Sequence, residues 1–122
     1  MNSDSQPDRP VIDLERALSR VADDRFILQE LVDIFLRESP RWLDDLDEAI
    51  AAGDPEGVFR AAHDIKGSTE VFCADQATQA ARQLERMGKK GQLDSADEAF
   101  GALQAELVWV RRALKDFRDP SA

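Results

Sequence analysis

The chain has 122 residues, of which 43% are hydrophobic and 34% are charged. This length predicts one domain, and this apolar content can bury a core, which argues against global disorder. The net charge of −9 repels phosphate backbones and anionic lipid head groups, so we expect neither nucleic acid nor membrane as a partner. A single cysteine and a single histidine exclude an internal disulfide and a zinc site built from thiolates and imidazoles.

The chain shows no pattern typical of export or membrane insertion. Its longest apolar runs are about four residues, whereas a membrane span needs about 20. The polar N-terminus lacks the basic start and the apolar stretch of a signal peptide. We therefore expect a cytoplasmic protein with a disordered tail over 1–10, a helical domain over 11–118 and a C-terminal tail over 119–122.

The first two predicted helices are a short segment over 11–22 and a long segment over 24–52. Apolar residues recur every three or four positions in both, which predicts one buried stripe along each helix. Pro40 removes a backbone donor inside the long helix and crowds the carbonyl four residues earlier, so we expect a kink near Arg37–Glu38. An acidic cluster follows, which lacks the spacing of a calcium site and is interpreted as a solvated face: Asp44, Asp45, Asp47 and Glu48.

The three remaining helices are predicted over 55–72, 75–90 and 95–117. Gly53, Asp54 and Pro55 form a helix stop, an N-cap and a first-turn proline in succession, and Gly91 forms a second stop. Ser95, with a glutamate three residues later, predicts a capping box for the last helix. Because the connections are short, successive helices should be antiparallel neighbours. The predicted architecture is an all-α antiparallel four-helix bundle with a short additional N-terminal helix across one end.

The third predicted helix carries the candidate site. Its predicted core face contains Val58, Ala61, Ala62, Ile65, Thr69 and Phe72. His63 points about 160° away from the centre of that face and shares its own face with Lys66 and Gly67. A glycine inside an exposed helix costs about 1 kcal/mol relative to alanine, and room for another macromolecule to reach the imidazole is one reason for its presence. Lys66 would supply positive charge beside an anion attached to the ring.

Each of these residues also has a plain structural interpretation. A lone histidine on a helix is more often only a polar residue, and a lone lysine is more often a solvated charge. Gly67 alone could mark close helix packing, although it faces away from the core stripe. Phe59, one turn before His63, is either an exposed docking anchor or a residue partly covered by the neighbouring helix. Cys73 is interpreted as a small buried residue.

The sequence AHDIKGS at 62–68 resembles the A-H-x-[LI]-K-G-[SA] motif of the histidine phosphotransfer (HPt) domain family of two-component phosphorelays. The resemblance covers roughly residues 11–117 and includes the FLRESP segment at 35–40. It implies a protein that accepts a phosphoryl group on His63 from the aspartyl phosphate of a receiver domain. The phosphoryl group then passes to another receiver aspartate in a multistep phosphorelay. In this interpretation Lys66 stabilises the phosphoryl charge and Gly67 gives steric access.

The resemblance also identifies candidate residues around the motif and departures from it. Phe59, Asp64 and Glu70 are the candidate partner-binding residues. Glu70 replaces a residue that is usually small, and it adds a negative charge two turns along the reactive face. Cys73 replaces a glycine. Glu85 stands where some members have a glutamine that hydrogen-bonds the imidazole, which makes it a candidate for orienting the ring of His63.

The expected partners are response-regulator receiver domains and hybrid sensor kinases, and a monomer is the simplest expectation. The chain has no Gly-rich phosphate loop, so we expect a phosphohistidine carrier without ATP-dependent kinase activity of its own. We expect no cofactor or metal in this chain and place Mg²⁺ on the receiver domain. The alternative function is a non-phosphorylated helical binding module that docks and regulates receiver domains. A phosphatase acting on receiver domains is a third hypothesis.

Overall fold

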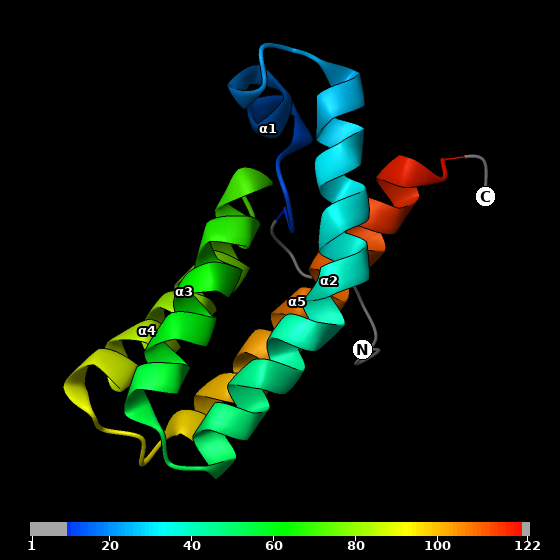
Figure 1. Ribbon diagram of the computed structural model, residues 1–122. Coiled ribbons are helices and arrows are strands. Elements are labelled where there is room, and N and C mark those ends of the chain that lie inside the picture. The colour runs from blue at the N-terminus through cyan, green and yellow to red at the C-terminus, as the bar shows by residue number, and fades with distance from the viewer. Residues whose placement is uncertain (1–9, 121–122) are drawn as a thin grey trace, which may run out of the picture.

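The computed structural model describes residues 10–120 as five helices. These are α1 (Leu14–Arg20), α2 (Arg25–Ala51), α3 (Pro55–Val71), α4 (Asp75–Lys90) and α5 (Ala96–Arg118). Helices α2 to α5 pack as a four-membered bundle in which α3 lies between α2 and α4, and α1 lies at one end (Figure 1). The predicted all-α bundle is therefore confirmed. The predicted N-terminal tail falls almost entirely on residues 1–9, which lie outside the described residues.

Most helix ends follow local sequence signals. Three helices begin at an aspartate whose carboxylate accepts first-turn backbone N–H bonds, namely Asp13, Asp24 and Asp54. Gly53 and Gly91 adopt the left-handed conformation at φ 63° and 70°, as a helix stop requires. The predicted capping box at Ser95 is wrong, because this N-cap makes no side-chain hydrogen bond. The Ser95 backbone, at φ −107° and ψ 17°, lies outside the extended region that turns a cap side chain toward the first turn.

Helix α1 is shorter than predicted and caps the end of α3. It spans Leu14–Arg20 rather than 11–22, because Ala22 and Asp23 turn the chain with φ values of 57° and 60°. Arg20 Nη1 donates a hydrogen bond to the backbone oxygen of Glu70 at 2.9 Å. The last turn of α3 contains no basic residue of its own. A guanidinium from α1 therefore adds a second donor to this carbonyl at the α3 terminus, which also accepts from the Cys73 N–H at 3.0 Å.

Helix α2 continues through Pro40 without a break, and the kink stays a prediction. Because proline has no N–H, the carbonyl of Leu36 lacks its normal donor inside the helix. Arg111 of α5 donates to this carbonyl oxygen at 2.9 Å and also donates to the hydroxyl of the buried Ser39. This contact, which no local sequence pattern indicates, ties α5 to α2 where the proline interrupts the hydrogen-bond ladder.

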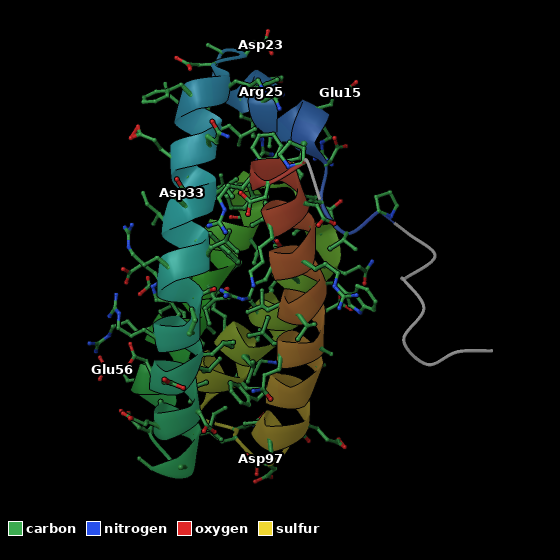
Figure 2. The ribbon with its side chains drawn as sticks, turned by 90° about the vertical axis from the view of Figure 1, so that its right-hand side faces the viewer. Glu15, Asp23, Arg25, Asp33, Glu56 and Asp97 are labelled. Atoms are coloured by element: carbon green, nitrogen blue, oxygen red, sulfur yellow. The ribbon has the colours of Figure 1, made fainter. Side chains whose placement is uncertain are left out.

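The bundle core follows the predicted apolar stripes. The buried residues of the predicted α3 core face are Val58, Ala62, Ile65, Thr69 and Phe72, whereas Ala61 is only partly buried. Cys73 is buried, as predicted. Figure 2 shows the charged side chains of Asp23 and Asp97 at opposite ends of the bundle. Among the helices within residues 10–120, none is long and apolar enough to cross a membrane.

Candidate functional site

His63 lies on the exposed side of α3. The side chain is 58% exposed, whereas Ala62 and Ile65 on the opposite side of the helix are fully buried. This placement follows from the 3.6-residue period, because the apolar positions of α3 fix which side of the helix enters the core. The predicted orientation of the histidine toward solvent is confirmed by its exposure.

The imidazole is held by a carboxylate from the neighbouring helix. His63 Nδ1 lies 2.5 Å from Oε2 of Glu85, whose side chain is only 13% exposed. An ionised carboxylate can only accept, so in the neutral imidazole Nδ1 carries the proton and Nε2, at the opposite edge of the ring, keeps its lone pair. Burial raises the pKa of Glu85, but hydrogen bonds from His63 and Lys66 outweigh burial and bring this pKa below its ordinary value. Glu85 therefore favours the ionised form.

Lys66 binds the second oxygen of the same carboxylate. Its Nζ lies 2.9 Å from Glu85 Oε1, and its side chain is 20% exposed. Glu85 thus bridges the histidine and the lysine, which are one turn apart on α3. The Lys66 ammonium therefore shares one carboxylate with the imidazole, and its direct partner is Glu85. An ammonium group has three donors, so two N–H groups of Lys66 stay available to another acceptor.

Two glycines near the site have opposite roles. A Cβ added to Gly67 would meet no atom within 4 Å, so the surface one turn after His63 is open. A Cβ added to Gly88 would lie 2.5 Å from the backbone nitrogen of Phe59 and 2.7 Å from the backbone oxygen of Pro55. Gly88 therefore permits close approach of α3 and α4, which brings Glu85 within reach of the imidazole. Sequence reasoning missed Gly88, although its position four residues after the buried Leu84 places it on the inward stripe of α4.

Phe59 is half-buried and stacks on the histidine. The two ring centroids are 5.9 Å apart and the ring planes differ by 18°. The structure thus combines the two interpretations of Phe59, because the residue is partly covered by α4 and still contributes to the surface at His63.

The two predicted acidic partner-binding residues lie on different sides of α3. Glu70 is exposed, and its carboxylate lies 3.8 Å from Arg82 of α4. Asp64 is exposed and lines a groove between α2 and α3 together with Asp45 and Glu48. Neither carboxylate has a recorded contact with His63 within the described chain. Among residues 10–120, no group of three or more His, Cys, Asp or Glu side chains is arranged to hold a metal ion.

Comparison with known proteins identifies the family. Residues 30–113, which are more than half of the chain, match the family described as Hpt domain. The chain belongs to the Hpt domain family. This confirms the resemblance found in the sequence, and the AHDIKGS segment lies within the matched residues.

A curated relative is the phosphorelay intermediate protein rdeA of Dictyostelium discoideum, which is 27% identical over 89 residues. The alignment covers 73% of this chain but only 35% of that protein, so the chain spans about a third of the length of its curated relative.

Solved Hpt structures share the fold. The crystal structure of histidine-containing phosphotransfer protein B from Pseudomonas aeruginosa PAO1 superposes with a TM-score of 0.83 at 25% identity, covering 93% of this chain and 98% of that chain. The HPT domain of a sensor hybrid histidine kinase from Shewanella gives a TM-score of 0.77 at 16% identity, covering 92% and 97% of the two chains. The helical bundle of this Hpt protein therefore matches the fold of the family over almost its full length.

Proposed function

We propose that this Hpt protein is a phosphorelay intermediate that carries a phosphoryl group on His63. One observation carries the proposal: Nδ1 of the exposed imidazole lies 2.5 Å from Glu85 Oε2, so the neutral ring donates a hydrogen bond there and keeps Nε2 free for attack. The open space at Gly67 leaves room for a second protein to bring an acyl phosphate to that nitrogen. Membership of the Hpt domain family supports the same chemistry.

The proposed reaction is an in-line displacement at phosphorus. The Nε2 lone pair forms the N–P bond while the P–O bond to the aspartate of a receiver domain breaks, and the aspartate leaves as a carboxylate. The imidazole keeps its Nδ1 proton and becomes a positively charged phosphoimidazolium ring. In the reverse direction, or toward a second receiver domain, an aspartate carboxylate attacks phosphorus and the neutral imidazole leaves. Positioning and charge stabilisation supply most of the rate of such transfers.

We assign Glu85 to the orientation of the ring. Its carboxylate fixes the tautomer that leaves Nε2 unprotonated, and it stabilises the positive charge that the ring gains on phosphorylation. Lys66 is proposed to stabilise the charge of the phosphoryl group, because its ammonium binds the same carboxylate as the ring and has two further N–H groups available. Any Mg²⁺ needed for transfer is expected on the receiver domain.

The proposed partners are receiver domains, including those of hybrid sensor kinases. Phe59, which stacks on the histidine, and the exposed Asp64 and Glu70 are proposed to contact the docked receiver domain. An apolar groove of about 80 Å³ begins at Ser68, beside the open Gly67, and continues between α2 and α3. Apolar surface next to a polar rim is typical of protein docking sites. The apolar residues that line this groove are Leu31, Ile34, Phe35, Trp42, Val71 and Phe72.

The proposal is tested by incubating the full chain with a receiver domain that carries a labelled aspartyl phosphate. We expect acid-labile, base-stable label on this chain, because that lability is typical of phosphohistidine. His63→Gln should abolish the label, since His63 is the single histidine of the chain. Label that survives this substitution contradicts the assigned site. Absence of label with every receiver domain of the source organism would instead favour the non-phosphorylated binding module.

A further inference from the structure

The helices on either side of His63 differ in charge. Although the chain has a net charge of −9, α4 carries four basic and two acidic residues. One acidic residue, Glu85, is engaged by His63 and Lys66, and the other, Asp75, lies in the first turn at the far end of the helix. The second half of α4 therefore presents a positive surface. We define the α4 basic surface as Arg82, Arg86, Lys89 and Lys90.

The α4 basic surface forms a continuous row on the outside of the bundle. Arg82, Arg86 and Lys89 are spaced four and three residues apart, which places them along one side of the helix. Within residues 10–120, Arg86, Lys89 and Lys90 make no recorded ion pair, and the only recorded pair of Arg82 is with Glu70 at 3.8 Å. A partner can therefore bind these cations without displacing a close internal carboxylate.

The row reaches the reactive ring through a groove beside Phe59. This groove has a volume of about 540 Å³. Pro55, Phe59 and Gly88 contribute to its lining, and Lys89 and Lys90 line it at the end of α4. Glu56 is the one carboxylate in the lining, and it pairs with Arg60 at 3.0 Å. Because Phe59 stacks on His63, a protein segment seated in the groove would contact the edge of the phosphorylation site.

The other side of α3 has the opposite charge. The groove between α2 and α3 is lined by four carboxylates and one guanidinium. These residues are Asp45, Glu48, Asp54, Asp64 and Arg60. Because α3 lies between α2 and α4 (Figure 1), His63 stands between an acidic surface and a basic surface. This arrangement favours one orientation of a partner that is itself charged near its reactive group.

We infer that the α4 basic surface binds the acidic rim of the receiver domain around its phosphoaspartate and so orients that domain over His63. The inference rests on the proposed function. The partner site contains a phosphorylated aspartate and the carboxylates that would hold Mg²⁺ there, because carboxylate oxygens are the ligands that this ion takes. The acidic groove at α2 repels such a rim and the α4 basic surface attracts it. The overall negative charge of the chain disfavours nucleic acids as the alternative polyanion.

The test compares two charge reversals of equal size. Arg86→Glu/Lys89→Glu alters the α4 basic surface, and Arg112→Glu/Lys115→Glu is the matched control on α5, which packs against α2 and α4. Both pairs are three residues apart and both include a lysine in the last turn of a helix. Circular dichroism and urea unfolding of both variants establish that they fold. The second-order rate constant for phosphoryl transfer from the receiver domain is then measured at about 20 mM and about 500 mM salt, which changes the screening length severalfold.

We expect the α4 variant to react about tenfold more slowly than wild type at low salt, and within about twofold of wild type at high salt. The α5 control should stay within about twofold at both salt concentrations. Equal rates for the two variants, or a loss that does not depend on salt, would overturn the inference about α4 while leaving the proposed function intact. A wild-type chain that never acquires label contradicts the proposed function and this inference with it.

Discussion

Gly67→Ala separates the stability of this protein from its proposed activity. No atom lies within 4 Å of the added methyl group, so the substitution meets no obstacle in the free protein. Alanine is a better helix former than glycine by about 1 kcal/mol, and Gly67 lies inside α3. The variant should therefore be more stable by up to about 1 kcal/mol, which corresponds to a rise of about 4 °C in Tm for a domain of this size.

Phosphoryl transfer should fall in the same variant. If a receiver domain packs against the open position, the methyl group overfills that contact at a cost of about 1–3 kcal/mol. This cost corresponds to a loss of about fivefold to more than a hundredfold in transfer rate. The measurements are thermal unfolding and the initial rate of label transfer.

Gly101→Ala is the matched control, because Gly101 lies inside α5 and an added Cβ there also meets no atom within 4 Å. It should gain similar stability and transfer at the wild-type rate. Equal transfer rates for Gly67→Ala and Gly101→Ala would refute the idea that Gly67 gives the receiver domain access to His63. A loss of stability in Gly67→Ala would contradict the open space beside Gly67 in the free protein.

Three further substitutions test the packing and electrostatics of the site. Gly88→Ala should lower the free energy of unfolding by about 3 kcal/mol or more in urea titrations, since the new Cβ would overlap backbone atoms of α3; stability equal to wild type would contradict the close contact. The folded-state pKa of Glu85 lies below its ordinary value of 4.5, so its stabilising contribution is present above about pH 4.5 and is lost as the pH falls through the lowered pKa. Glu85→Gln should therefore be less stable than wild type at neutral pH, and it should lose less stability than wild type when the pH falls below about 4.5. If the unfolding midpoint of the variant falls with acid as steeply as that of wild type, the result would count against an ionised Glu85 carboxylate. Arg111→Met should cost about 1.5–3 kcal/mol because it leaves the Leu36 carbonyl without a donor, whereas the exposed Lys115→Met should change stability by less than about 0.5 kcal/mol; equal effects would show that the Arg111 contact is dispensable.

The amino-acid sequence determined the helices and the orientation of the histidine. Asp54 and Pro55 start α3 and Gly91 ends α4, and these signals work because they act within one turn of the backbone. The exposed position of His63 also followed from local pattern, since the apolar residues of α3 leave only one side for solvent. The capping box predicted at Ser95 was wrong, because the backbone conformation there is incompatible with the capping hydrogen bond that the residue types favour.

Only the tertiary structure decided what surrounds the imidazole. Glu85 is 22 positions away from His63 in the sequence, and no pattern within either helix states that its carboxylate accepts from Nδ1 and from Lys66 at the same time. The contact depends on how closely α3 and α4 approach, which Gly88 permits because it has no side chain. The hydrogen bond from Arg111 to the Leu36 carbonyl depends in the same way on the packing of α5 against α2. Helix periods fix which side of each helix is buried, whereas the distance between helices depends on the side chains of both partners together.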